Sequence, residues 1–185
     1  MEKVTVADIM VPLAEYATVS QEASLYEAVM ALEKAQTRFD QNKYRHRAIL
    51  VFGDQEKIVG KLSQMDVIRA LEPKYKEMGD VRKMSHWELS PAFLESMMKS
   101  FDLWQTPLED ICRKAGQMKI KDIMYTPAAG EYVQRDTTLD QAINQLIVGH
   151  HQSLLVTQEE RVVGILRLTD VFHQVCKVMK ECSLD

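Results

Sequence analysis

Apolar residues gather in two similar pairs of short runs, and each pair predicts two strands joined by a turn. The first pair is AILV at 48–51 and IVG at 58–60, separated by the polar segment GDQEK. The second pair is SLLV at 153–156 and VVG at 162–164, separated by QEER. Short runs rich in Ile, Leu and Val with a polar turn between them are typical of β-hairpins. The chain therefore predicts the same hairpin twice.

The sequence before each hairpin is repeated as well. VADIM at 6–10 returns as IKDIM at 120–124, an offset of 114 residues. Four further matches share this offset: Val19 with Val133, Leu25 with Leu139, Ala28 with Ala142, and Leu32 with Leu146. A fixed offset over many positions indicates a repeated structural unit.

Each repeat predicts a helix before its hairpin and another after it. The first helix begins with a capping box, Ser24 with Glu27 in one repeat and Thr138 with Gln141 in the other. Apolar residues at helical spacing follow each hairpin, at 65–71 and 169–179.

The predicted unit is β-α-β-β-α, an α+β (α/β) fold that occurs twice. We define the first copy as 1–72, the insert as 73–118 and the second copy as 119–182. Neither copy has a large core alone, so we expect a pseudo-two-fold pair that packs through its sheets. The side chains expected to be mainly buried are Leu25, Val29, Leu50 and Val51 with their counterparts Leu139, Ile143, Leu155 and Val156.

The order of these motifs resembles the CBS domain, and the two copies together resemble the CBS pair known as a Bateman module. The resemblance covers 4–71 and 119–180. It rests on the two DIM segments, the capped helices, and the endings GKLSQMDV at 60–67 and GILRLTDV at 164–171. It implies a regulatory module that binds an adenine nucleotide or related adenosyl ligand between its copies.

The resemblance places a candidate nucleotide site at the end of each hairpin. In the family pattern, Ser or Thr follows Gly and two apolar residues, and Asp stands three residues further on. The first copy has Gly60, Ser63 and Asp66, although Lys61 replaces an apolar residue. The hydroxyl would contact a phosphate and the carboxylate would accept hydrogen bonds from the ribose. A helix cap with an acidic first turn explains Ser63 and Asp66 without any ligand.

The second copy departs from this pattern. It keeps Gly164 and Asp170 but has Arg167 where the hydroxyl should be. Arg167 can pair with an acidic neighbour or project into the cleft toward a phosphate. We expect one competent site, centred on Ser63 and Asp66, with the second site altered or empty.

Basic residues precede the first hairpin in the segment KYRHR at 43–47. His46 aligns with His151 of the second copy, so we expect both to face the cleft between copies. Arg47, with Lys43 and Arg45, would add positive charge near a triphosphate. A solvated basic loop is the alternative, and we favour it for Arg45.

The insert predicts two helices. Ser90 and Pro91 mark the start of one, which carries a stripe of Phe93, Met97, Phe101 and Trp104. Thr106, Pro107 and Glu109 predict a capping box for the other, which ends at Gly116. We expect this helical hairpin to pack on the module's own sheet or on a second subunit, in preference to forming a groove for another partner.

Composition restricts the function further. The chain has 185 residues, 46% hydrophobic and 27% charged, with a formal charge of -4, and three cysteines. This balance offers no basic surface for nucleic acid. The absence of a signal peptide or an apolar span predicts a cytoplasmic protein with no membrane segment.

The leading hypothesis is therefore a stand-alone regulator, a homodimer that binds AMP, ADP, ATP or S-adenosylmethionine and signals to an unidentified protein. A structural interaction module with no bound nucleotide is the alternative, and Arg167 favours it. No catalytic or metal-ligand pattern is present, so we expect neither an enzyme nor a metal site.

Overall fold

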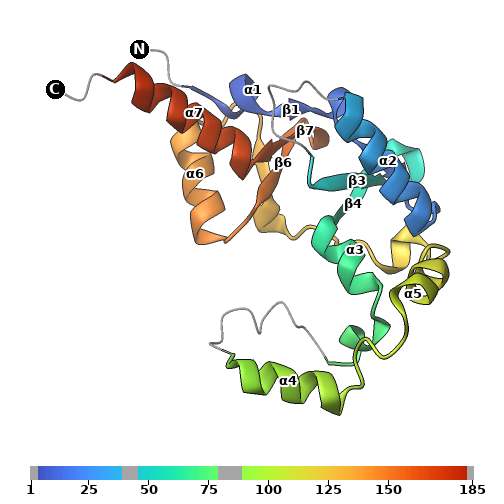
Figure 1. Cartoon of the computed structure of the whole chain (residues 1–185). Helices are drawn as coiled ribbons and strands as arrows, with labels where there is room; N and C mark the ends of the chain where they lie inside the picture. Colours follow the sequence, from blue (N-terminus) through green and yellow to red (C-terminus); the bar gives the residue numbers. More distant parts are fainter. Residues whose placement is uncertain (1–3, 39–45, 79–88, 183–185) are drawn as a thin grey trace.

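The computed structural model describes residues 4–38, 46–78 and 89–182 (Figure 1). Its helices are α1 (Val6–Ile9), α2 (Leu25–Arg38), α3 (Gln64–Ala70), α4 (Pro91–Ser100), α5 (Leu108–Ala115), α6 (Leu139–Val148) and α7 (Leu168–Glu181). Its strands are β1 (Val11–Pro12), β2 (Thr18–Ser20), β3 (Ala48–Phe52), β4 (Ile58–Ser63), β5 (Tyr132–Gln134), β6 (Ser153–Gln158) and β7 (Arg161–Arg167).

Both predicted hairpins form, each within its own sheet. β3 pairs with β4 in a sheet of order β2-β3-β4, and β6 pairs with β7 in a sheet of order β1-β7-β6-β5. The strand before the first helix of each copy runs parallel to the first hairpin strand. Each copy therefore has the predicted β-α-β-β-α order, and the α+β fold is confirmed.

The two copies exchange their opening segments. β1, from the start of the chain, pairs with β7 of the second copy, and Tyr125 forms the equivalent bridge with Lys61 of β4. The backbone N–H of Leu139 donates to Val4, and that of Leu25 donates to Met118. These reciprocal bonds tie each copy to the segment that precedes the other.

The glycine of each hairpin makes room for the exchanged segment. A Cβ atom at Gly60 would lie 2.5 Å from the sulfur of Met124, and one at Gly164 would lie 2.6 Å from the carbonyl oxygen of Val11. Any larger side chain would meet these atoms. The DIM segments and the hairpin glycines of the repeat are therefore complementary parts of one contact.

A shared apolar cluster joins the two sheets. It contains Val11, Tyr16, Leu50, Leu155 and Ile165, so residues from both copies contribute. Each sheet also packs on its helices in a second core, to which the exchanged segment adds Ile120 in one case and Val6 in the other. Of the eight predicted core residues, five are buried, while Val29, Leu139 and Ile143 are half-buried. The pseudo-two-fold pair is confirmed.

The two helices of the insert pack differently from each other. α5 packs on the first copy, where Ala115 joins the core, but α4 stands away from both sheets (Figure 1). Phe93 and Phe101 are 45% and 40% exposed, so the α4 stripe does not cover the module's own sheet. α4 ends at Ser100, because the backbone turns through a positive φ at Asp102.

Three of the four predicted helix starts have the correct N-cap residue, but the cap bonds differ. Ser24 and Glu27 form the predicted capping box, and Ser90 accepts from the N–H of Phe93. Thr138 precedes α6 without a side-chain cap bond. The predicted box at Thr106 is wrong, because α5 begins after Pro107 and has no side-chain cap. Early acidic residues in α5 favour that helix start without the box.

Candidate functional site

Ser63 and Asp66 form a complete capping box at the junction of β4 and α3. The hydroxyl of Ser63 donates to one carboxylate oxygen of Asp66 at 2.6 Å, and the N–H of Asp66 donates back to that hydroxyl at 3.2 Å. The other carboxylate oxygen accepts from Arg69 at 3.2 Å. Asp66 is only 9% exposed. The pair is therefore positioned by helix capping, and Arg69 contacts the second carboxylate oxygen of Asp66.

Arg47 lies beside this pair. Its carbonyl oxygen accepts from the N–H of Gln64, the first residue of α3, and its side chain is exposed. Arg47, Ser63 and Asp66 are thus brought together where β3 begins and β4 ends. Lys43 and Arg45 lie outside the described residues.

The second copy places an ion pair in the corresponding position. Arg167 forms two hydrogen bonds with the carboxylate of Asp170, and Arg167 is 6% exposed. Of the two roles predicted for Arg167, this is the pairing with an acidic neighbour. This bidentate guanidinium–carboxylate contact gives both oxygens of the Asp170 carboxylate a hydrogen-bond donor.

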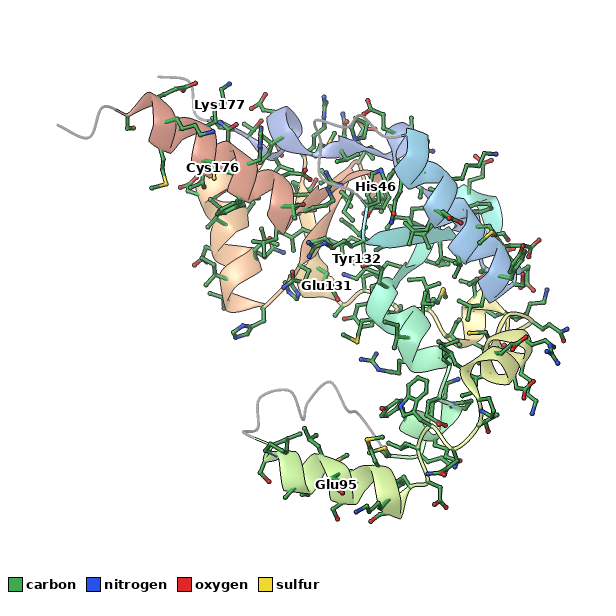
Figure 2. The ribbon with its side chains drawn as sticks, viewed as in Figure 1. His46, Glu95, Glu131, Tyr132, Cys176 and Lys177 are labelled. Atoms are coloured by element: carbon green, nitrogen blue, oxygen red, sulfur yellow. The ribbon has the colours of Figure 1, made fainter. Side chains whose placement is uncertain are left out.

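His46 connects this ion pair to the first copy. Its Nδ1 lies 3.3 Å from a guanidinium nitrogen of Arg167, and the ring is fully buried (Figure 2). A guanidinium only donates hydrogen bonds, so Nδ1 is the acceptor and carries no proton. His46 and Arg167 therefore bridge the two copies.

Tyr16 completes the buried cluster around His46. The two rings meet edge to face with centroids 4.3 Å apart. Burial raises the pKa of Tyr16 to about 12, an effect that Arg167 opposes and Asp170 adds to. The phenol therefore stays neutral at physiological pH, beside the ion pair of Arg167 with Asp170.

A third polar cluster lies at the junction of the copies, formed by Lys61, Tyr125 and Glu131. Glu131 accepts from the ammonium of Lys61, from the hydroxyl of Tyr125 and, at 3.1 Å, from the N–H of Ala128. The side chains of Lys61 and Glu131 are 16% and 4% exposed. Lys61 also lies 5.3 Å from the ring centroid of Tyr125. The lysine that departs from the family pattern is thus paired with the second copy's opening segment.

The protonation of Glu131 reflects these contacts. Burial alone would raise the pKa of its carboxyl group, but hydrogen bonds from Lys61, Tyr125 and Ala128 outweigh burial and lower the pKa below its ordinary value of 4.5. A carboxyl group with a lowered pKa stabilises the fold above its unfolded pKa, and this stabilisation is lost as pH falls through the folded pKa.

We expect the stability of the protein to fall with acid below about pH 4.5, in part through Glu131. Glu131→Gln should show a shallower dependence in this range because it has no proton to bind. Urea unfolding measures the free energy of unfolding of both proteins between roughly pH 3 and 7, a range that includes the ordinary pKa of a carboxyl group. Parallel curves for the two proteins would contradict the assignment.

Two cavities lie elsewhere in the molecule. One of about 320 Å³ is lined by the end of the first copy and the insert, including Leu71, Lys74 and Lys114. The other, of about 440 Å³, lies between α1 and the ends of β5 and β6. Neither is lined by any of the six predicted site residues.

Comparison with known families identifies the repeat. The family model for the CBS domain matches residues 6–73 and 120–177, and these two segments make up more than half of the chain. The chain belongs to the CBS domain family. Comparison with curated proteins gives no match in sequence.

Solved CBS structures share the fold at low sequence identity. CBSX2 from Arabidopsis thaliana is 19% identical with a TM-score of 0.62, and the alignment covers 98% of this chain and all of that one. A structure of CBSX2 in complex with AMP is 17% identical with a TM-score of 0.59, covering 95% and 98% of the two chains. The CBS domain of a bacterial CNNM/CorC family Mg²⁺ transporter in complex with ATP is 14% identical with a TM-score of 0.59, covering 94% and 87%. None of the described helices could cross a membrane.

The CBS repeat pattern identifies some residues of these polar clusters from sequence but gives no signal for others. Lys61 was visible as a departure from the apolar position that Ile165 fills in the second copy. Tyr16, Tyr125 and Glu131 lie in the opening segments, where no motif singles them out. The contacts of Tyr125 and Glu131 with Lys61 depend on the exchange of those segments, which the repeat itself does not reveal.

Proposed function

We propose that this CBS pair is a regulatory module that binds one adenine nucleotide, at the first copy, around Arg47, Ser63 and Asp66. The observation that carries the proposal is the position of Ser63 and Asp66, a hydroxyl and a nearly buried carboxylate at the end of β4 beside an exposed arginine. Neighbouring CBS structures with AMP and with ATP support this ligand class.

Nucleotide binding at this site requires one exchange of partners. Asp66 would release Arg69, whose side chain is 27% exposed, and accept hydrogen bonds from the ribose hydroxyls instead. A partly exposed arginine loses little when water replaces its partner. Arg47 would contact the phosphates. S-adenosylmethionine shares the ribose contact but has no phosphate for Arg47, so we rank it below AMP, ADP and ATP, and we assign no metal to the site.

The second copy would not bind nucleotide under this proposal. The carboxylate of Asp170 is already held by Arg167, which also contacts His46. A ligand would have to displace this buried contact and leave the guanidinium without its carboxylate, which is costly. We therefore propose a stoichiometry of one nucleotide per chain.

A thermal-shift screen with AMP, ADP, ATP and S-adenosylmethionine tests the ligand class. A ligand that binds only the native state at 100 times its dissociation constant adds about 2.7 kcal/mol. For a chain of this size, that corresponds to a rise of about 5–11 °C in the melting midpoint. No shift with any of the four ligands would contradict nucleotide binding.

Signalling would occur through a changed surface or dimer, and we propose a homodimer. On α7 an apolar stripe with heptad-like spacing faces solvent: Leu168, Phe172, Val175 and Met179 are 37–62% exposed. Such a stripe fits a second helix better than water. We propose that a second subunit covers it and that the regulated protein responds to this arrangement in the cytoplasm. In this reading the module is a regulator and has no catalytic step.

We expect Phe172→Asp to shift the protein from dimer to monomer, because it places a charge in the centre of the stripe. Lys177→Asp is the matched control, a charge change at an exposed residue of the same helix that is not one of the four stripe residues; Figure 2 labels Lys177. Sedimentation velocity measures both variants. A monomeric wild-type protein, or a Phe172→Asp variant that remains dimeric, would contradict this interface.

A structural interaction module without nucleotide is the second candidate. It is favoured by the ion pair of Arg167 with Asp170 and by the capping contacts of Asp66, which satisfy both ribose-binding carboxylates internally. The thermal-shift screen separates the two candidates.

A further inference from the structure

The face between the two copies is nearly symmetric, and its symmetry is broken at the bridge of Lys61 as well as at His46 and Arg167. The ladder pair Val11 with Ile165 on one side corresponds to the bridge of Tyr125 with Lys61 on the other. Val11 and Ile165 are buried apolar residues in the shared cluster. This position is thus apolar on the first side, whereas on the other side it carries the largely buried charges of Lys61 and Glu131.

Three positions account for this difference. The repeat offsets make the following residues equivalent: Lys61 and Ile165, Tyr125 and Val11, and Glu131 and Ala17. Ile165, Val11 and Ala17 are all buried and uncharged. Their equivalents Lys61 and Tyr125 both form hydrogen bonds with the carboxylate of Glu131. The two halves of the interface therefore differ in charge although their backbones correspond.

Such symmetry creates a risk of wrong pairing. Because the copies have the same fold, the first copy of one chain could pair with the first copy of another chain. The second copies of two chains could pair in the same way. In the first case the ammonium of Lys61 would lie against Val11 and Ala17, with no carboxylate. In the second, the carboxylate of Glu131 would lie near Ile165, with no ammonium. A buried charge without its partner is strongly unfavourable.

We propose that Lys61, Tyr125 and Glu131 determine pairing specificity, so that each first copy associates with a second copy and not with its own kind. A buried ion pair is a weak source of net stability, since an apolar replacement of similar volume is often neutral or stabilising. We infer that this ion pair discriminates between partners, because pairing of two first copies or of two second copies would leave a buried charge unpaired. This role is independent of any nucleotide.

The test makes these three positions of the interface symmetric in the full chain. The triple variant Lys61→Ile, Tyr125→Val and Glu131→Ala places at each position the residue found at the equivalent position. After unfolding and refolding at increasing protein concentration, light scattering coupled to size exclusion measures the species formed. We expect wild type to return as one discrete species and the triple variant to form a concentration-dependent series of larger ones.

Two further proteins sharpen the result. The double variant Lys61→Met with Glu131→Gln removes both charges with little change of shape and should also lose the single species. The reversed pair Lys61→Glu with Glu131→Lys keeps the charge difference between the copies, so this variant should still refold to a single species. A single species from either uncharged variant, or failure of both to refold, would overturn the proposal, since the cluster would then serve stability alone.

Discussion

Arg167→Met is expected to lower the free energy of unfolding by about 3–5 kcal/mol, because it leaves the carboxylate of Asp170 buried without its partner. For a chain of this length, the melting midpoint should fall by about 6–20 °C. The side chains of Arg167 and Asp170 are 7% and 15% exposed, so water replaces the lost contact poorly. His46 loses the donor to its Nδ1 in the same variant.

Two controls separate the buried pair from charge in general. Arg113→Met removes an arginine of α5 that is 71% exposed and pairs with Glu109 and Asp110 at the surface, so its effect should stay within about 1 kcal/mol. Arg167→Met combined with Asp170→Leu removes both charges and should recover much of the loss. Calorimetric melting compares the proteins. If Arg167→Met melts with the wild type, the cluster that bridges the copies does not stabilise the pair.

Asp66→Ala is expected to weaken nucleotide binding by about one to two orders of magnitude. The substitution removes the acceptor for the ribose hydroxyls, and hydrogen bonds to a charged group contribute about 1.5–3 kcal/mol. Asp170→Ala should weaken binding less, because the carboxylate of Asp170 is already held by Arg167. Titration calorimetry with the best ligand from the thermal-shift screen measures both affinities.

The interpretation of Asp66→Ala depends on an intact fold. Asp66 also completes the capping box with Ser63, so the variant should lose about 1 kcal/mol of stability. Circular dichroism and the melting midpoint establish how much of the protein is folded at the titration temperature. Asp110→Ala, at a half-exposed position of α5, is the control for loss of a carboxylate. Equal nucleotide affinity in Asp66→Ala and wild type would show that the nucleotide site does not include Asp66.

The repeat was a sufficient guide to the fold because apolar periodicity and equal spacing depend on local sequence. Both hairpins, the helices that flank them and the shared burial of Leu50 and Leu155 followed from that pattern. The packing of the insert did not follow, since the same stripe of Phe93 and Phe101 suits a sheet, a second subunit or solvent exposure in an unpartnered helix.

The polar clusters show a similar limit. Ser63 and Asp66 could be found from their spacing, because a capping box is a contact between residues three apart. The partner of Lys61 lies 70 residues away in Glu131, and that of His46 lies 121 residues away in Arg167. These contacts exist only because the copies exchange their opening segments and pack sheet against sheet.

The stoichiometry of nucleotide binding tests the central claim most directly. Titration calorimetry of the wild-type protein with AMP and with ATP should give one site per chain, with heat that disappears or weakens strongly in Asp66→Ala. Two equivalent sites per chain would contradict the assignment of Arg167 as an internal partner that occupies the second site. No binding of either nucleotide would contradict the regulatory proposal and favour the structural module.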